Sequence, residues 1–238
     1  TLRVTVRQQP LHAPPILFAH RGASAHEREN TLAAFGRAIE LGATGIESDV
    51  WITSDGVAVL DHDGTIGTLR KRPISACRRD ELPDHIPTLD QLYDLIGADV
   101  HLSLDLKDPE ALDAVLLSAR RVGAAARLWL CFHEWTALAE WRDRAHDVRL
   151  VDSTRLRSME RGPERRAAQL RAAGIDAVNL HQSEWTGGNV AVFHRFGRFA
   201  LGWDAQFDRL IERLLHMGLD GVYSNHVDRL TESAAPYV

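Results

Sequence analysis

The sequence predicts an α/β fold in which eight parallel strands, each followed by a helix, close into a TIM, or (β/α)8, barrel. Three observations support this fold class. Short apolar runs alternate with helical patterns, glycines follow the helical segments, and the 238 residues approach the ~250 that such barrels usually contain. Repeated strand–helix–strand units join through right-handed crossovers into a parallel sheet. We expect one barrel domain over residues 1–238.

The individual elements follow from local patterns. Strands are expected at the short apolar runs 16–20, 45–52, 57–62, 101–106, 127–132, 148–152, 176–180, 198–203 and 221–224. Helical patterns cover 31–41, 88–97, 110–122, 134–144, 160–173, 187–196 and 206–217. Glycines at 42, 97, 123, 174 and 218 stand where those helices should stop, as helix C-caps do.

One strand does not fit the alternation of strands and helices. Only TSDG separates 45–52 from 57–62, whereas a parallel crossover needs a dozen residues or more. The two runs therefore form an antiparallel hairpin that turns at Asp55-Gly56. The second run is then an extra strand outside the ring.

The hairpin also predicts where its polar ends meet. If the turn has two residues, Asp49 lies opposite His62. A register two residues different would bring His62 nearer Glu47 instead. In either register, His62 returns to the carboxylates of the second strand.

An open, doubly wound sheet is the competing architecture. A Gly-rich phosphate-binding loop after the first strand would favour it, but no such pattern follows residue 20. The segment from about 63 to 87 is irregular, with neither a strand nor a helix pattern, and carries the basic stretches RKRP and RR. We interpret it as a short insertion at the C-terminal face of the barrel, with the basic tract a solvated loop rather than a headgroup or membrane contact.

Composition narrows the classes of partner. The chain is 45% hydrophobic and 26% charged with a net charge of −5, so we expect no nucleic-acid partner. No apolar run approaches the ~18 residues of a membrane span, which predicts no stable membrane insertion. The opening TLRVTVRQQPLHAPP lacks the apolar core of a secretory signal. A cytoplasmic location follows, although a chain that does not begin with Met leaves a processed leader open. The oligomeric state is not determined.

Polar residues gather at the ends of the predicted strands, where barrel enzymes place their active sites. The first strand ends in His20 and is followed by Arg21, and Gly22 permits a sharp exit from it. Glu29 and Asn30 then precede the helix at 31–41, for which Asn30 is a suitable N-cap. This loop should form one wall of a site.

Carboxylates and a lysine follow on neighbouring strands. Side chains alternate across a strand. Glu47 and Asp49 therefore share one face of the strand at 45–52, and Asp105 and Lys107 share one face of the strand at 101–106 and its extension. The leucines between 102 and 106 should face the helices, which directs Asp105 and Lys107 inward. Any one of these carboxylates could simply be salt-bridged, but together they require a common explanation.

That explanation is a cation beside a phosphoryl group. Crowded carboxylates raise one another's pKa unless a cation holds them, and all-oxygen ligation suits one Mg²⁺ or Ca²⁺ better than zinc. Arg21 and Lys107 next to such an ion would cradle a phosphoryl group. His20 and His62 are then candidates for general base and general acid, with the order of the two open.

The strings HRG and ENT, then ESDVWITSDGVAVLDHD, IPTLDQL and SLDLK, resemble the glycerophosphodiester phosphodiesterase family. The similarity is specific over 16–107 and looser afterwards. It implies a metal-dependent TIM barrel that hydrolyses a small-molecule glycerophosphodiester to glycerol 3-phosphate and an alcohol. By position it also implies catalytic His20 and His62, metal ligands Glu47, Asp49 and Asp105, phosphate- or substrate-binding Arg21, Lys107 and Trp203, and Glu29 and Asn30 near the metal.

Several positions depart from the family pattern. Asp105 stands where Glu is common, and Arg28 replaces a common proline before ENT. WDAQ from 203 replaces the usual WTVN, and YSN at 223–225 stands where TD is usual. These differences bear on substrate preference more than on reaction class.

Three rival functions stay open. A lysophospholipase D would use the same site on longer lipids and needs an apolar rim, for which the candidates are Trp51, Phe132, Trp135, Trp185 and Trp203; each is better explained as core packing. A zinc amidohydrolase barrel would need an H-x-H pair, which is absent from the sequence. A phosphate-binding barrel without catalysis would most easily have lost a histidine or a ligand.

Overall fold

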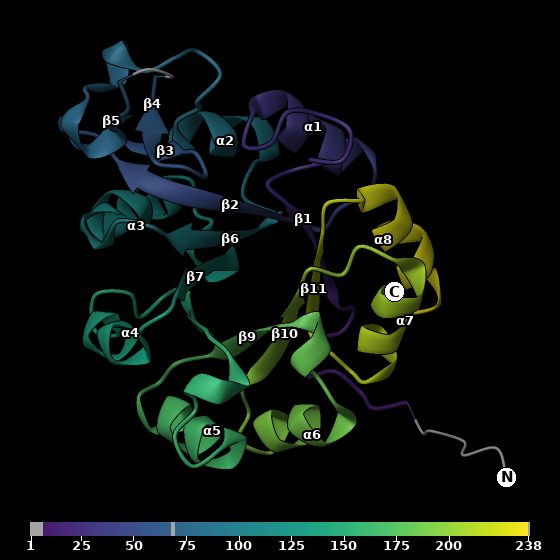
Figure 1. The fold of residues 1–238 in the computed structure, drawn as a ribbon. Helices are drawn as coiled ribbons and strands as arrows, with labels where there is room; N and C mark the ends of the chain where they lie inside the picture. The colour runs from purple at the N-terminus through teal and green to yellow at the C-terminus, as the bar shows by residue number, and fades with distance from the viewer. Residues whose placement is uncertain (1–6, 68–69, 238) are drawn as a thin grey trace, which may run out of the picture.

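The computed structural model describes residues 7–67 and 70–237, and its closed ring of eight parallel strands confirms the predicted barrel (Figure 1). The ring order is β1-β11-β10-β9-β8-β7-β6-β2, and pairing of β1 with β2 closes it. β3 lies outside the ring, antiparallel to β2. Residues 1–6 of the N-terminal stretch, residues 68–69 of the predicted insertion and residue 238 lie outside the described part.

All nine predicted strands are present, each within two residues of its expected bounds. The ring consists of β1 (Ile16–His20), β2 (Gly45–Ile52), β6 (His101–Leu106), β7 (Leu128–Phe132), β8 (Arg149–Ser153), β9 (Ala177–His181), β10 (Phe199–Trp203) and β11 (Gly221–Ser224). The extra strand is β3 (Ala58–Leu60).

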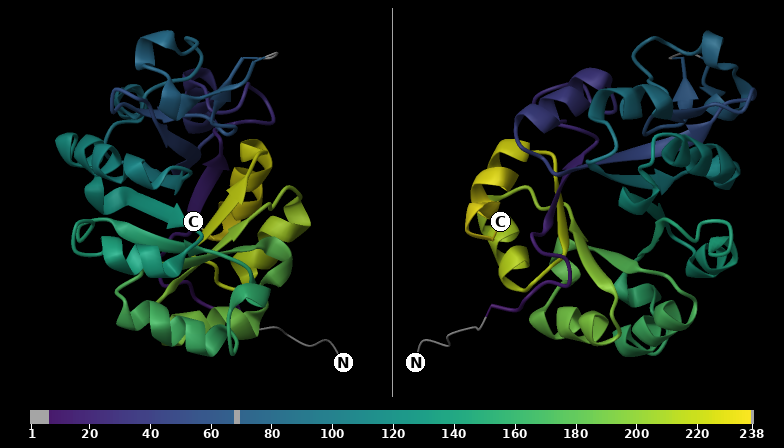
Figure 2. Two further views of the ribbon diagram at one scale, coloured as in Figure 1. Left: turned by 60° about the vertical axis from the view of Figure 1, so that its left-hand side comes forward. Right: turned by 180° about the vertical axis from the view of Figure 1, so that it is seen from behind.

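Helices surround the ring on its outside (Figure 2). They are α1 (Leu32–Glu40), α2 (Leu89–Ile96), α3 (Leu112–Arg121), α4 (Trp135–Trp141), α5 (Pro163–Ala172), α6 (Gly187–Arg195), α7 (Asp208–His216) and α8 (Val227–Ala234), the last of which was not predicted. Short 3-10 turns are η1 (Ile74–Ala76), η2 (Arg79–Glu81), η3 (Pro109–Ala111), η4 (Ala125–Arg127), η5 (Leu156–Ser158), η6 (Gln182–Glu184) and η7 (Ala235–Tyr237). Among the described helices, none is long and apolar enough to cross a membrane.

The strands divide the core into two layers, as side-chain alternation predicts. The leucines at 102, 104 and 106 belong to the outer layer, which packs against the helices. The barrel interior is a separate cluster of Ile16, Phe18, Trp129, Cys131, Val151, Ala177, Leu201 and Tyr223. Phe18 and Tyr223 stack there with ring centroids 4.5 Å apart. This aromatic layer fills the barrel beneath the strand ends.

The hairpin between β2 and β3 has a different register from the predicted one. Val50 pairs with Leu60, and the amide of Asp61 donates to the carbonyl of Asp49. The turn between them contains three residues, 54–56, because Thr53 N–H donates to Val57 O. One extra turn residue shifts the pairing by one position, so the prediction that Asp49 lies opposite His62 was wrong.

The predicted insertion has a small structure of its own at the end of β2 (Figure 1). It contains the two-stranded antiparallel sheet of β4 (Thr65–Ile66) and β5 (Arg72–Pro73). Its apolar side chains Ile74, Cys77, Leu82 and Ile86 form a separate cluster with Val59 of β3. Arg72 of the basic tract is exposed and pairs with Glu81 at 3.0 Å, which agrees with a solvated tract.

Candidate active site

A cavity of ≈ 470 Å³ opens at the carboxyl ends of the barrel strands. Seven of the predicted site residues line it: His20, Arg21, Glu47, Asp49, Asp105, Lys107 and Trp203. The other three, Glu29, Asn30 and His62, line a neighbouring cavity of ≈ 130 Å³. The structure thus brings most of the predicted residues together in one place.

The turn after β1 explains how two successive residues enter the site. Arg21 and Gly22 both have left-handed backbone, with φ of 57° and 77°. The Arg21 amide donates to Glu47 O at 3.0 Å, which ties the turn to β2. Gly22 lies against α1 so closely that a Cβ would fall 2.7 Å from the carbonyl carbon of Ala34. The predicted sharp exit is present and requires glycine.

His20 is held in one tautomer by Asn225, which the sequence analysis noted only as part of YSN at 223–225. Its Nδ1 lies 2.7 Å from Asn225 Oδ1, and because an amide oxygen only accepts, Nδ1 carries the proton. Gln206 orients Asn225 through two hydrogen bonds. Its Oε1 accepts from the backbone N–H of Asn225 at 3.0 Å, and its Nε2 donates to Asn225 Oδ1 at 3.3 Å. In the neutral ring, Nε2 is then the nitrogen without a proton, and it lies 3.7 Å from Glu47 Oε2.

The charge state of His20 suits a proton acceptor. Burial lowers its pKa from the ordinary value, and the Arg21 guanidinium lowers it further. The hydrogen bond to Asn225 and the carboxylates act in the opposite direction without cancelling the shift. At neutral pH the ring is thus neutral, with Nε2 ready to accept a proton.

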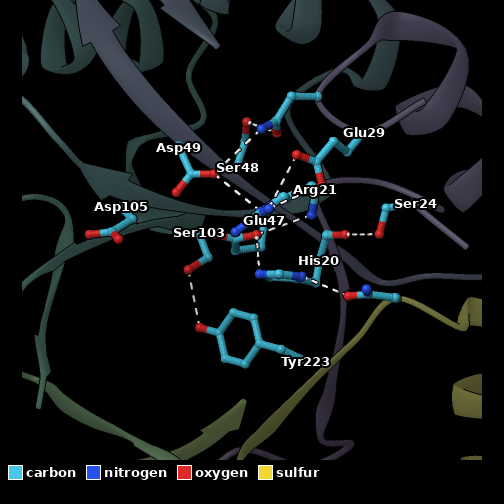
Figure 3. A network of polar contacts seen from close by, with 12 residues as sticks. His20, Arg21, Ser24, Glu29, Glu47, Ser48, Asp49, Ser103, Asp105 and Tyr223 are labelled. Carbon is cyan, nitrogen blue, oxygen red and sulfur yellow. Dashed lines mark hydrogen bonds and ion pairs between the residues drawn. The ribbon is translucent and has the colours of Figure 1, made fainter. Parts of the chain in front are cut away.

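Arg21 lies between two carboxylates from different elements (Figure 3). Its Nη1 donates to both oxygens of Glu29, at 3.0 and 3.2 Å. Its Nε lies 3.4 Å from Asp49 Oδ2. This arrangement fixes the guanidinium at the rim of the carboxylate group.

The carboxylate group is crowded and largely buried, and Lys107 lies within it. Burial raises the pKa of Glu47 well above its ordinary value, and Asp49 and Asp105 raise it further. Lys107 Nζ lies 3.1 Å from Asp49 and 2.5 Å from Asp105. Burial alone would lower the pKa of Lys107, but the two carboxylates outweigh it and raise the pKa. Lys107 is therefore a fixed positive charge.

Asn30 supports the site rather than the helix. Its Nδ2 donates to Asp49 Oδ2 at 3.4 Å, and its Oδ1 accepts from Ser48 Oγ at 2.7 Å. The N-cap of α1 is Thr31, whose side chain accepts from the Ala34 amide. The expectation that Asn30 caps this helix was wrong, because its left-handed backbone, φ 54°, directs its amide to the carboxylates.

His62 is separate from His20 in this structure. Its side chain is 41% exposed, and its Nδ1 lies 2.9 Å from Asp63. It shares its cavity with Glu29, and Glu29 in turn contacts Arg21 of the larger cavity. The Glu29–Arg21 ion pair thus joins the cavity that His62 lines to the cavity that His20 lines.

Sequence reasoning missed the residues that complete the cavity. Ser103 and Tyr223 join through their hydroxyls at 3.1 Å beneath the carboxylates (Figure 3). Thr154, Arg155 and Asn179 line the opposite side. Thr154 and Arg155 directly follow β8, and that position is the signal by which they could have been found.

The donor set suits a hard divalent cation, although it forms no ready-made cage. The three carboxylates supply oxygen ligands, and burial, with Asp49 and Asp105 beside it, raises the pKa of Glu47. The ammonium of Lys107 now lies between Asp49 and Asp105. Within 7–67 and 70–237, no three His, Cys, Asp or Glu side chains are arranged to hold a metal.

Comparison with known proteins indicates one family. The Glycerophosphoryl diester phosphodiesterase family model matches residues 20–229. A Caldanaerobacter subterraneus glycerophosphodiester phosphodiesterase is 36% identical over 109 residues, which cover 39% of this chain and only 45% of that protein's length. A Mycobacterium tuberculosis protein named as a probable glycerophosphodiester phosphodiesterase 2 is 27% identical over 93% of this chain and 91% of its own length.

Solved structures share the fold at lower identity. An Oleispira antarctica phosphodiesterase, crystallised with the product sn-glycerol-3-phosphate, has a TM-score of 0.75 and 22% identity. The match covers 93% of this chain and 97% of that one. Because the family model spans nearly the whole barrel, the chain belongs to the glycerophosphoryl diester phosphodiesterase family.

Proposed function

We propose that this protein hydrolyses glycerophosphodiesters to glycerol 3-phosphate and an alcohol. The observation that carries the proposal is His20, a neutral histidine whose Nε2 lies 3.7 Å from Glu47, in a cavity that three carboxylates and two fixed cations line. Membership of the family and the product bound in the Oleispira structure support the substrate class. The cavity of ≈ 470 Å³ is in the size range of small-molecule sites.

The cations of the site would bind the phosphoryl group. Arg21 offers planar N–H donors and Lys107 a point charge, and both lie beside the carboxylates from β2 and β6. Because they are held before substrate arrives, they stabilise charge that develops on the phosphoryl oxygens without reorganising.

Two histidines would move the protons. His20 Nε2 accepts the proton of the attacking hydroxyl, which belongs either to water or to the substrate's own glycerol. Asn225 keeps the proton on Nδ1 and so keeps Nε2 available. His62, beside Asp63, is the general acid in this proposal and protonates the leaving alcohol.

A divalent cation, Mg²⁺ or Ca²⁺, would be held by Glu47, Asp49 and Asp105. When bound, it would supply Lewis-acid stabilisation of charge on the phosphoryl oxygens. Asp105 is one methylene shorter than the glutamate common in the family, so we expect its reach to influence which ion is preferred.

Release of glycerol 3-phosphate from the choline, ethanolamine and glycerol diesters tests the proposal. The protein is assayed after chelation and then with Mg²⁺, Ca²⁺, Mn²⁺ or Zn²⁺ restored singly. Activity that is lost on chelation and regained with Mg²⁺ or Ca²⁺ is the expected result. Silence across the panel would refute it and favour a barrel that binds phosphate esters without cleaving them.

Substitution of the histidines tests the proton transfers. His20→Ala and His62→Ala are each expected to lower kcat by about 10²–10⁴-fold, the usual contribution of general acid–base catalysis. His146→Ala, at an exposed position outside the cavity, is the matched control. Near wild-type turnover in either site variant would reject its assigned role.

Hydrolysis of longer lysolipids at the same site is the alternative. It needs an apolar rim, yet the large exposed hydrophobic residues of the described chain lie elsewhere: Leu11, Leu32, Leu95, Leu117 and Phe207. A lysophosphatidylcholine arm in the same assay separates the two, because faster turnover of the lysolipid would favour the alternative.

A further inference from the structure

The side of the cavity across the ring from the carboxylates has a different chemistry. In the ring order, β9 lies opposite β2 and β10 lies opposite β6 (Figure 1). β9 places Asn179 in the cavity, β10 places Trp203 there, and the loop after β8 adds Thr154 and Arg155. We call these four residues the far wall. Since the proposed chemistry takes place at the carboxylates, the far wall is left for the rest of the substrate.

Arg155 brings an unneutralised positive charge to the far wall. No carboxylate of the described residues lies within ion-pair distance of it, whereas Arg21 and Lys107 are each paired. Its guanidinium lies over the Trp203 ring, 4.5 Å from the centroid. Stacking uses the face of the guanidinium and leaves its edge donors unengaged. Those donors are the ones that bind a carboxylate or phosphate bidentately.

Asn179 adds an acceptor that has no partner in the protein. The residue is 7% exposed, and its Oδ1 is buried without a hydrogen bond from any described residue. Buried polar atoms are normally satisfied, and one left without a partner costs free energy. Because Asn179 is also a lining residue, its unsatisfied oxygen favours a ligand that brings an N–H or O–H group to this wall.

The Trp203 ring is poorly placed to receive a cationic alcohol. Quaternary ammonium groups are recognised by open aromatic faces. Here Arg155 already covers the indole ring of Trp203. A choline group would meet a like charge at the one aromatic residue of the far wall.

We propose that the far wall selects glycerophosphodiesters whose leaving alcohol carries an anionic group. The anionic group pairs with Arg155, and a donor on the same alcohol reaches Asn179 Oδ1. This inference rests on the proposed hydrolysis and deepens it by naming the class of alcohol.

Two diesters that differ by a single carboxylate test the selection. Glycerophosphoserine is expected to exceed glycerophosphoethanolamine in kcat/KM by about tenfold or more, as for one charge-assisted hydrogen bond. Arg155→Met should bring the ratio close to unity and raise kcat/KM for glycerophosphocholine, a gain that a merely structural disturbance would not produce. Arg157→Met, two residues along at an exposed position outside the cavity, should keep the wild-type ratio.

Binding measured without turnover separates this inference from the proposed reaction. Calorimetric Kd values for the two diesters are obtained with the His20→Ala variant, with and without Arg155→Met. Tighter binding of the serine diester that depends on Arg155 supports the inference even if the wild type cleaves nothing, a result that would reject the reaction alone. Equal Kd values, or a preference that survives Arg155→Met, would overturn the inference while leaving hydrolysis intact.

Discussion

Gly22→Ala should be far more damaging than a substitution at another glycine of similar backbone. Gly22 has φ of 77° and Gly56 has φ of 81°, so alanine at either position adopts a left-handed conformation. That strain costs roughly 1–2 kcal/mol for an L-residue. Gly56 has nothing within 4 Å of an added Cβ, so no further cost is expected there.

Gly22 carries a second cost because it packs on α1. An added Cβ would lie 2.7 Å from the Ala34 carbonyl carbon and 2.8 Å from its Cβ and oxygen. The obstacle is mostly backbone, so the turn or the helix must move, and overpacking of this kind costs about 1–3 kcal/mol. Together the two terms predict a loss of about 2–5 kcal/mol for Gly22→Ala, against about 1–2 kcal/mol for Gly56→Ala.

Urea unfolding followed by circular dichroism measures both variants. The same displacement should reduce kcat/KM in folded Gly22→Ala, because the Arg21 amide would lose its position on Glu47. Gly56→Ala, which is not among the residues that line the cavity, should keep wild-type kinetics. Equal losses of unfolding free energy in the two variants would refute the packing argument, and unaltered kinetics in Gly22→Ala would refute its link to the site.

Other predictions concern buried charge and buried thiols. Burial raises the pKa of Asp152 to about 6 despite its ion pair with Arg166. Between about pH 4 and 6 the folded state then keeps a proton that the unfolded state has lost. The free energy of unfolding should therefore fall by up to about 3 kcal/mol as the pH rises through this range. Asp152→Asn should remove this fall in urea titrations, and an unaltered pH slope would contradict it. Lys107→Met should lower kcat/KM by about 10²–10³-fold, and a loss below about tenfold would argue against a phosphoryl contact. Cys77 and Cys131 are buried, and burial raises the pKa of Cys131, so thiol reagents should modify them only after unfolding; rapid reaction of native protein would be incompatible with this.

Local patterns were sufficient for most of the fold. Alternation in 101–107 correctly separated the leucines, which pack on helices, from Asp105, which lines the cavity. The TSDG turn correctly identified a hairpin outside the ring. The register of that hairpin was wrong because it depends on whether the turn holds two residues or three, and Gly56 permits both.

The site was predictable only where its residues share a strand end. His20, Glu47 and Asp49 were expected together and line one cavity, although their catalytic and metal-binding roles stay predictions. Asn225 was missed as the partner of His20, since 205 positions separate the two in sequence. Nothing local indicates that pair, because the closure of the ring alone brings β11 beside β1.

By itself, the sequence determined the chemistry that reaches the barrel mouth. Which side chains face inward depends on the two-residue period of each strand, and which lie at the mouth depends on where each strand ends. Only the tertiary structure decided how those side chains are paired. The tautomer of His20 depends on Asn225, and the cover of Trp203 depends on Arg155. These contacts join separate strands and loops, so they exist only once the ring has closed.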